Sequence, residues 1–436
     1  MITLSHKIEL KPNNKQKTYF RKAFGCARLA YNWGLAEWQR MYKEGEKPSG
    51  YTLRKKFNAI KGEEFPFVYE VTKHATDKPF VDLQDAFTRF FKGQCDYPQF
   101  KKKKDTSGSF FINGAVIHLS YTNTNSKRFK KMSHNKEQKR HYLIVPRLGC
   151  VRMTERLRFD GKICWVTISQ ECGRFYASFT VTMTEAEYNR THKHAKREKH
   201  GKVGIDMGLK STLITSDGMG IDNPKFEYKD ERRKKRLQRK LAKRVHPRTK
   251  AERLQGVKKS NNYRKLERKV NNFTHKVTER RRNFIQKTTT ILATTYNEIV
   301  LETLNVDGMK RNHKIARSVS DVAWYEIGRQ LEYKAELNGG KVVRAERWFA
   351  STKTCSQCGN KKDKAPLHMR IYRCDCCGMV MDRDVNAAIN LKRIIGVEYS
   401  ESTPVDLTAL RHRFSVNGVA TSKVESGKQR TLVGGL

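Results

Sequence analysis

The segment from residue 355 to residue 390 places two metal-binding patterns directly before an acidic motif. It reads CSQCG at 355–359, CDCCG at 374–378 and DRDVNAAIN at 382–390. Two CxxCG knuckles at this separation are typical of a zinc ribbon, whose four thiolates hold the ion tetrahedrally. A carboxylate at the start of a helix is not part of that pattern. The segment therefore predicts a small metal module inserted into a larger fold, just before that fold supplies a catalytic acid.

The expected zinc ligands are the four cysteines in CxxC register, Cys355, Cys358, Cys374 and Cys377. Cys376 lies outside that register and is expected to be a spare thiol. Thiolates favour zinc over harder ions, and four of them leave no open coordination position. We therefore expect a structural site and not a catalytic one.

Three carboxylates share a context that suits a second kind of metal. Asp206 and Glu302 each follow a short apolar run typical of a buried strand, and Asp384 begins the helix predicted after the ribbon. An acid after an apolar strand more often caps a turn, so each one alone is a weak indication. Together, such carboxylates can hold two divalent ions about 4 Å apart, which activate water and stabilise the leaving 3′ oxygen of a phosphodiester. Hard oxygen ligands favour Mg2+ or Mn2+.

The composition indicates a nucleic-acid partner. The chain has 436 residues, and its 90 Lys and Arg against 44 Asp and Glu give a formal net charge of +46. An excess of this size is expected to be neutralised by DNA or RNA. No apolar run approaches the roughly 18 residues of a membrane-spanning helix. We therefore expect no membrane partner. Five cysteines scattered singly along the chain are typical of a reducing compartment, so we expect a cytoplasmic protein.

The first part of the sequence predicts a small barrel interrupted by helices. Residues 1–10 alternate like a strand, whereas apolar residues recur at helical spacing from residue 15 onward, with further helices expected at 51–60 and 82–91. After residue 108 the period changes to two. Strands are expected at 115–121, 141–146, 162–170 and 175–183. The first strand is expected to pair with these later ones, which makes the helical region an insertion.

The second part predicts an α/β domain. Strands are expected at 202–206, 211–215, 297–302 and 341–345, and a helix at 321–337. Residues 226–287 are helix-forming and rich in Lys and Arg, and they are interpreted as two antiparallel helices that track phosphates. A solvated hairpin is the alternative for this segment. The order of strand, hairpin, helices, strand and helix matches an RNase H-type fold.

Several segments resemble motifs of the TnpB family, the nucleases encoded by bacterial and archaeal insertion sequences. The first, second and third RuvC motifs, the zinc ribbon and two N-terminal signatures all have counterparts in the family's order. The family more often has Asn after the glutamate of the second motif, where this chain has Thr303. The matching segments are 24–33, 97–103, 203–209, 301–309, 351–359 and 382–390.

The resemblance implies RNA-guided, Mg2+-dependent cleavage of double-stranded DNA. A non-coding RNA from the transposon end would supply the guide RNA, and a short transposon-adjacent motif would license unwinding of the target DNA. By the family's pattern, the catalytic and metal-binding acids would be Asp206, Glu302 and Asp384. Asn386 and Asn390 of the third motif are expected to orient the helix and not to bind metal.

The implied fold class is multidomain α+β. An RNase H-like (RuvC) nuclease domain would carry the inserted zinc ribbon, and a β-barrel wedge domain would carry an inserted helical recognition domain. The expected boundaries are 1–14 and 108–198 for the wedge barrel with its linker, 15–107 for the recognition domain, 199–349 for the RuvC domain, 350–381 for the ribbon and 382–395 for the third RuvC motif. The tail, 396–436, has little apolar periodicity and is expected to be disordered.

Other activities are compatible with the same residues. A compact type V CRISPR effector shares the same core and differs in its genetic neighbourhood. An RNA-guided repressor without cleavage would keep the fold, although the presence of all three acids argues against that role. A DNA-strand transferase would use the carboxylates to join DNA. Sequencing the RNA that accompanies the protein would distinguish most of these activities. The sequence leaves open whether the protein is a monomer or a weak dimer.

Overall fold

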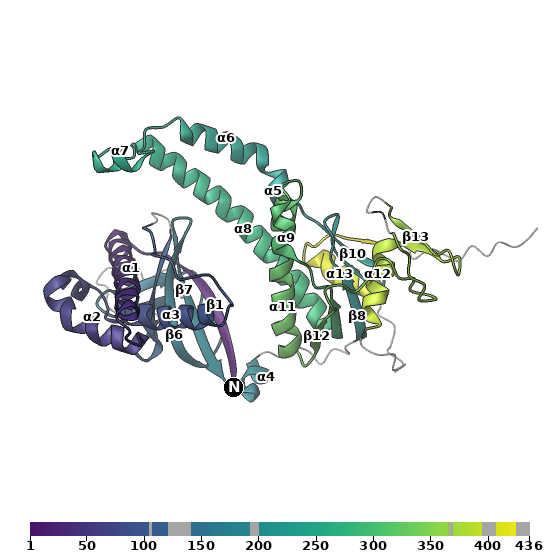
Figure 1. Cartoon of the computed structure of the whole chain (residues 1–436), viewed down its shortest axis with the longest axis horizontal. Coiled ribbons are helices and arrows are strands. Elements are labelled where there is room, and N and C mark those ends of the chain that lie inside the picture. Colours follow the sequence, from purple (N-terminus) through teal and green to yellow (C-terminus); the bar gives the residue numbers. More distant parts are fainter. Residues whose placement is uncertain are drawn as a thin grey trace, which may run out of the picture. The chain divides into compact units, whose positions relative to one another are not determined.

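The computed structural model describes residues 1–103, 107–120, 141–191, 200–364, 366, 369–394 and 407–423. The chain divides into two compact units, Met1–His194 and Ala195–Leu436 (Figure 1). Each unit contains its own large β-sheet. Within the described ranges, no helix is both long and apolar enough to cross a lipid bilayer.

The first unit is built on an antiparallel sheet. Its strands are β1 (Ile2–Leu10), β2 (Gly108–Asn113), β3 (His118–Ser120), β4 (His141–Val145), β5 (Gly149–Met153), β6 (Lys162–Glu171) and β7 (Arg174–Met183). They lie in the order β2-β6-β7-β1-β5-β4-β3. β1 pairs with β7 from Ile2 opposite Met183 to Leu10 opposite Phe175. The predicted pairing of the first strand with the later ones is therefore confirmed.

This sheet curls so that its two edge strands approach each other. β2 and β3 lie at opposite edges, yet only residues 114–117 separate them in the chain. A 3-10 turn at Gly114–Val116 makes the corner, where a Cβ on Gly114 would lie 1.9 Å from the carbonyl oxygen of Ile163. Only glycine fits this close approach. The strand expected at 115–121 was therefore wrong in its first residues, because the chain turns there.

The helices inserted into the sheet share an aromatic core. They are α1 (Asn14–Lys43), α2 (Gly50–Glu64), η1 (Pro66–Glu70) and α3 (His74–Phe91). The side chain of Asn13 accepts the N–H of Gln16 at 2.9 Å, and the Gln16 side chain accepts the N–H of Asn13 at 3.0 Å, which caps α1. Trp38 of α1 stacks on Phe87 of α3 with ring centroids 4.1 Å apart. Buried aromatic packing of this kind holds the insertion together.

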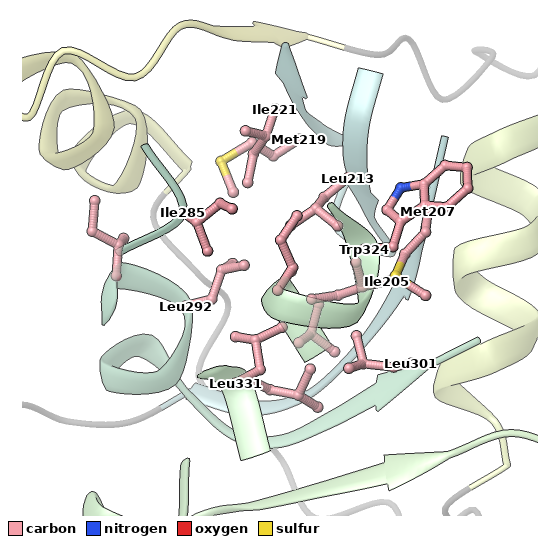
Figure 2. Close-up of a cluster of buried hydrophobic side chains, with 14 of the residues drawn as sticks. Ile205, Met207, Leu213, Met219, Ile221, Ile285, Leu292, Leu301, Trp324 and Leu331 are labelled. Carbon is pink, nitrogen blue, oxygen red and sulfur yellow. The ribbon is translucent and has the colours of Figure 1, made fainter. Parts of the chain in front are cut away.

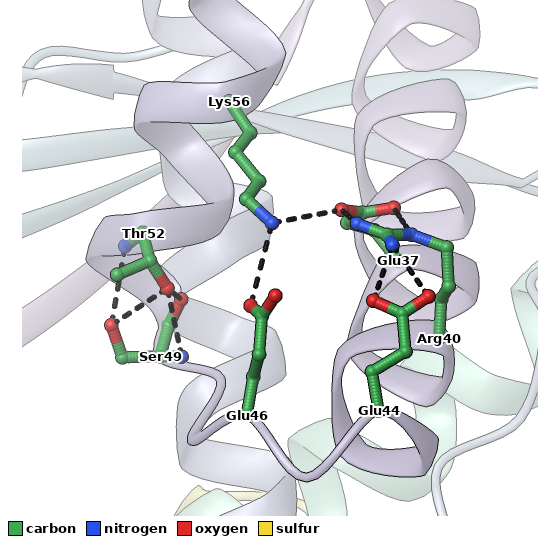
Figure 3. A network of polar contacts seen from close by, with 7 residues as sticks. All are labelled: Glu37, Arg40, Glu44, Glu46, Ser49, Thr52 and Lys56. Atoms are coloured by element: carbon green, nitrogen blue, oxygen red, sulfur yellow. Dashed lines mark hydrogen bonds and ion pairs between the residues drawn. The ribbon is translucent and has the colours of Figure 1, made fainter.

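Ion pairs cover the connection between α1 and α2 (Figure 3). Lys56 reaches Glu37 at 3.3 Å and Glu46 at 3.6 Å, and Arg40 pairs with Glu37 on its own helix and with Glu44, which directly follows that helix. Most of these side chains are about half exposed, so each pair contributes only about 0–1 kcal/mol to stability. They orient the α1–α2 connection more than they stabilise it.

The second unit is built on a mixed sheet. Its strands are β8 (His200–Asp206), β9 (Ser211–Thr215), β10 (Met219–Asp222), β11 (Tyr296–Leu301), β12 (Lys341–Arg344) and β15 (Thr421–Lys423). They lie in the order β12-β11-β8-β9-β10-β15. β8, β9 and β10 form an antiparallel meander, whereas β11 runs parallel to β8, and β12 runs parallel to β11. Parallel neighbours need long crossovers, which helices supply here.

Two helices lead into the parallel strands and cover the core. α8 (Asn261–Thr295) precedes β11, and α11 (Trp324–Leu337) precedes β12. Their apolar faces meet side chains of the sheet in one buried cluster, which includes Ile205, Leu292, Leu301 and Leu331 (Figure 2). The helix expected at 321–337 is in fact divided, because Ala323 has a φ of 58° and separates α10 (Ala316–Val322) from α11.

The basic segment, predicted as two antiparallel helices, is divided into four helices, of which the two longest pack together. α5 (Phe226–Lys229), α6 (Glu231–Ala242) and α7 (Lys250–Leu254) precede α8, and α6 runs beside α8 (Figure 1). Arg233 of α6 lies over the ring of Phe273 of α8 at 5.5 Å from its centroid. α6 has no buried residue, so most of its Lys and Arg side chains are open to a polyanion.

The expectation of a disordered tail was wrong for residues 407–423. These residues form α13 (Leu407–Val416) and β15, which pairs antiparallel with β10. Leu410, Phe414 and Val419 are at most 3% exposed and belong to the core of the second unit. Three apolar anchors are too few to give a periodic signal, but they complete a core that the rest of the unit has formed. Residues 396–406 and 424–436 lie outside the described residues.

Replacing Phe414 with alanine is expected to lower the free energy of unfolding of the second unit by about 3 kcal/mol, because it empties a fully buried aromatic site. Val416→Ala is the matched control, since Val416 lies on the same helix and is 72% exposed. Urea unfolding followed by circular dichroism would measure both. Equal stability of the two variants would contradict the ordered tail.

Candidate active site and zinc site

Two of the three predicted acids lie at neighbouring strand ends. β8 ends at Asp206, and Glu302 directly follows β11. The two strands are parallel neighbours, with Leu301 paired to Ile205. The residue that follows this pair in each strand therefore lies at the same edge of the sheet. The fold brings Asp206 and Glu302 together, although they are far apart in the sequence.

The third acid reaches this edge because a helix packs directly on β8. α12 (Arg383–Lys392) carries Asp384 in its first turn. A Cβ on Gly204 would lie 1.9 Å from the carbonyl oxygen of Ala388, so only glycine allows the helix to come this close. Ala387 and Ala388 are fully buried in the same contact region. The glycine before Asp206 and the alanines after Asp384 are thus explained by helix–strand packing.

The carboxylates of Glu302 and Asp384 act electrostatically on Asp206. Asp206 is only 7% exposed, and its pKa is raised well above the usual range by burial, with further contributions from Glu302 and Asp384. Burial also raises the pKa of Glu302, which the hydroxyl of Ser351 opposes by donating a hydrogen bond at 3.3 Å. Buried carboxylates that repel each other fit a site for hard divalent cations, which would offset this repulsion.

Two arginines hold the carboxylate of Asp384. Arg383 donates to its Oδ1 from Nη2 at 3.0 Å and from Nε at 3.1 Å, and Arg370 donates to its Oδ2 at 3.3 Å. Among the described residues, the group whose ligand atoms lie close enough to share one metal ion is the four cysteines, not the three acids. In this structure the Asp384 carboxylate is therefore occupied by its two arginines, and its oxygens do not converge with those of Asp206 and Glu302 on one point.

The four predicted cysteines come together in the geometry of a zinc site. Their sulfur atoms all lie within 4.8 Å of one another. The Sγ atoms of Cys355 and Cys377, and those of Cys358 and Cys374, are 3.6 Å apart. Tetrahedral zinc with Zn–S bonds of about 2.3 Å requires sulfur atoms about 3.8 Å apart, so the set fits this ion. Cys376 is exposed and lies outside the cluster, as expected.

The two knuckles share one backbone geometry. The N–H of Cys355 donates to the carbonyl of Asn360, and the N–H of Cys374 donates to that of Met379, both at 2.8 Å. Gly359 has a φ of 78°, as the turn requires, and the matching glycine of the second knuckle has a φ of 71°. Backbone N–H groups of Cys377 and Cys376 lower the pKa of Cys374, which favours its thiolate, whereas burial and the neighbouring cysteines raise the pKa of Cys377.

Two buried asparagines connect α12 to the first knuckle. Asn386 accepts the N–H of Ser356 at 2.8 Å and donates to the carbonyl of Thr354 at 2.7 Å. Asn390 donates to the carbonyls of Ser351 at 2.8 Å and Thr354 at 2.6 Å. They hold the loop that carries Ser351, which in turn bonds Glu302. This agrees with the orienting role expected of the asparagines.

The sequence did not place Ser351, Arg370 and Arg383 beside the three acids. Ser351 lies four residues before Cys355, at the start of the segment 351–359 that resembles a family motif, and that resemblance is a signal that could have identified it. Arg383 stands between two acids in the third motif, which is a sequence signal for a local ion pair. No local pattern identifies Arg370, because only the ribbon fold returns it to Asp384.

Profiles of known families match three segments of the chain. Residues 179–313 match a family described as "Probable transposase", and residues 324–391 match "Cas12f1-like, TNB domain". Residues 1–47 match "Helix-turn-helix domain". In this structure that last segment forms β1 and α1.

Similar proteins extend over most of the chain. A candidate RNA-guided DNA endonuclease of Streptomyces pristinaespiralis is 30% identical over 404 residues, which cover 89% of each chain. The candidate RNA-guided DNA endonuclease InsQ of Escherichia coli strain K12 is 26% identical over 402 residues, 88% of this chain and 90% of that one. Among solved structures, the mini-RNA-guided endonuclease CRISPR-Cas_phi3 covers 90% of this chain and 92% of its own at 9% identity, with a TM-score of 0.44.

Proposed function

Because this chain belongs to the TnpB family, we propose that it is an RNA-guided endonuclease that cleaves double-stranded DNA. A guide RNA from the transposon end directs it to the matching DNA strand, and a short transposon-adjacent motif licenses unwinding. The observation that carries this proposal is the meeting of Asp206, Glu302 and Asp384 at one edge of the sheet.

The proposed reaction is hydrolysis of a phosphodiester at the carboxylate cluster. Asp206, Glu302 and Asp384 would hold Mg2+ or Mn2+, which would supply an activated water and stabilise the leaving 3′ oxygen. Burial of Asp206 limits the access of bulk water to this edge. Ser351 orients Glu302 through its 3.3 Å hydrogen bond. Arg370 and Arg383 add positive charge beside the cluster, which attracts the phosphate.

The proposed layout follows the two units. The strand order of the second unit, with an antiparallel meander and two parallel strands added to its first strand, supports an RNase H-like (RuvC) domain. The zinc ribbon, 350–381, is inserted before α12, and residues 407–423 add to the same sheet. The curled sheet and helical insertion of the first unit are the wedge and recognition domains.

The proposed partners are guide RNA and target DNA. Base pairing reads the DNA sequence, while the protein holds the heteroduplex through its backbone. The formal charge of +46 and the exposed Lys and Arg of α6 support this role. We assign a structural role to zinc, because four thiolates fill its coordination sphere.

Replacing Arg236, Arg239 and Lys240 of α6 with glutamine is expected to weaken RNA binding and to reduce its salt dependence. These side chains are exposed on a helix without buried residues. Each lost phosphate contact should lower the slope of log K against log salt by roughly 0.7–0.9. Filter binding across a salt series would measure the slope. An unchanged slope would favour the solvated hairpin over a phosphate-binding surface, and Gln238→Ala on the same helix is the control.

The direct test of the function uses the protein purified with its own RNA. Sequencing that RNA defines the matching DNA, which is then incubated with the complex and Mg2+. Cleavage of both strands is expected. Binding without cleavage would indicate an RNA-guided repressor, and joined DNA products would indicate a strand transferase. The genetic locus of the RNA separates a transposon nuclease from a CRISPR effector.

A further inference from the structure

Trp348 is strongly exposed on the loop between β12 and the zinc ribbon. Its side chain is 85% exposed, the highest value among the large apolar residues described apart from Met1. Tryptophan is highly buried on average, because covering its ring removes a large apolar surface from water. Where it stays exposed, it is often an anchor for a partner. The loop therefore offers a surface that the described part of the chain leaves uncovered.

The loop that carries Trp348 is fixed to the carboxylate cluster at both ends. On one side, Ala345 donates its N–H to the carbonyl of Leu301 at 2.8 Å and accepts the hydroxyl of Thr303 at 2.6 Å. Leu301 and Thr303 are the neighbours of Glu302 in the sequence. On the other side, Ser351 bonds the Glu302 carboxylate at 3.3 Å. Trp348 lies midway between the two anchors, so its backbone is within about 11 Å of each.

The chemistry beside the ring suits a nucleotide. The guanidinium of Arg347 lies 5.1 Å from the centroid of the Trp348 ring. Together the two side chains present a flat apolar face and a positive charge, which match the base and the phosphate of one nucleotide. Phe349, which is 37% exposed, extends the aromatic surface. In a duplex the faces of a base are covered by its neighbours, so such a surface selects an unpaired strand.

We propose that Trp348 and Arg347 form a stacking platform for an unpaired nucleotide of the strand held at the carboxylate cluster. This inference rests on the proposed nuclease function and deepens it. The platform seats a base close to the phosphate that approaches Asp206, Glu302 and Asp384. It also makes the site prefer single-stranded over paired DNA, because a paired base cannot offer its face to the indole.

The first test pairs a protein change with a DNA change. Target DNA carries one abasic nucleotide, moved stepwise across the cleavage position, and single-turnover rates are measured with the RNA-bound protein and Mg2+. At one position the abasic nucleotide is expected to slow the wild type about 5- to 100-fold. Trp348→Ala should show a similar loss on intact DNA and no further loss at that position. Trp348→Phe should restore most of the rate.

A second measurement does not depend on cleavage. Fluorescence anisotropy compares single-stranded oligothymidylate with an abasic oligonucleotide of equal length at fixed salt. The wild type is expected to prefer the strand with bases, and Trp348→Ala should lose that preference while keeping its affinity for the abasic strand. Unchanged melting temperature and zinc content would show that the variant is folded, as its exposure predicts.

The outcomes separate the two proposals. A wild type that prefers bases but never cuts matching DNA would overturn the nuclease function and leave the platform intact. A wild type that cuts, with Trp348→Ala cutting equally fast and keeping its preference for bases, would overturn the platform alone. If Trp348→Ala instead changes only the mass of the particle in sedimentation, the ring is covered by a second copy of the chain, and the platform is overturned as well.

Discussion

Replacing Asp206 with asparagine is expected to abolish DNA cleavage while stabilising the metal-free protein. Asp206 is 7% exposed, and burial and two neighbouring carboxylates, those of Glu302 and Asp384, raise its pKa well above the usual range. Asparagine keeps the shape of the side chain but removes the charge. It therefore removes both the cost of burying that charge and its repulsion by the two neighbouring carboxylates. We expect cleavage to fall by about three orders of magnitude or more, and the free energy of unfolding to rise by about 1 kcal/mol.

The two effects are measured separately. Single-turnover cleavage with saturating Mg2+ reports the reaction, and urea unfolding in a chelator reports the stability of the metal-free protein. Asp307→Asn is the matched control, because Asp307 is close to Glu302 in sequence but its side chain is 94% exposed. A variant at Asp206 that still cuts would refute the proposed active site. A variant that is inactive but also less stable would refute the penalty that we assign to its buried charge.

The same residue predicts a pH dependence with a definite sign. A carboxyl group whose pKa is raised on folding holds its proton more tightly in the folded state than in the unfolded state. The stability of the metal-free wild type should therefore fall as pH rises from the ordinary carboxyl pKa through the raised pKa of Asp206. Asp206→Asn should lack this component. Unfolding midpoints of both proteins across a pH series would show a difference that grows as pH rises.

Local sequence patterns were sufficient to predict features that depend on the residues of one short segment. The apolar run before Asp206 predicted β8, and the two CxxC pairs predicted a cluster whose sulfur atoms lie within 4.8 Å of one another. Both signals depend on spacing within a few residues, which the sequence shows directly. The alternation of residues 1–10 likewise predicted β1, because a strand has a period of two.

Three features that depend on contacts between distant segments were not predicted. Gly114 looked like an ordinary residue before a strand, and only the carbonyl of Ile163 at 1.9 Å from its hypothetical Cβ explains the corner there. Phe414 lacked periodic apolar neighbours, yet it is fully buried because β10 and α8 provide its surroundings. The pairing of Arg370 with Asp384 requires the ribbon to fold back on α12. In each case the partner lies far away in the sequence.

Removing the zinc ligand Cys358 is expected to release the ion, disorder the ribbon and slow cleavage, while the sheet of the second unit stays folded. Zinc bound by the four cysteines would hold the first knuckle, and Asn386 and Asn390 join that knuckle to α12 through hydrogen bonds of 2.6–2.8 Å. Once the knuckle loosens, Ser351 no longer orients Glu302. Disturbing such an outer contact typically costs about 10- to 100-fold in activity, and metal analysis beside single-turnover cleavage would measure both effects.

Cys376→Ser separates loss of zinc from loss of any thiol, because Cys376 is exposed and lies outside the cluster. It should keep both zinc and the wild-type cleavage rate, whereas Cys358→Ser should lose zinc and cut about 10- to 100-fold more slowly. Asn386→Ala then distinguishes the effect of losing zinc from the effect of losing the hydrogen bonds between the knuckle and α12. It removes two of those hydrogen bonds without changing a cysteine. It should retain zinc and still cut slowly. If it cuts at the wild-type rate, the ribbon does not act on the carboxylates through α12, and its contribution to cleavage must come from contacts with nucleic acid instead.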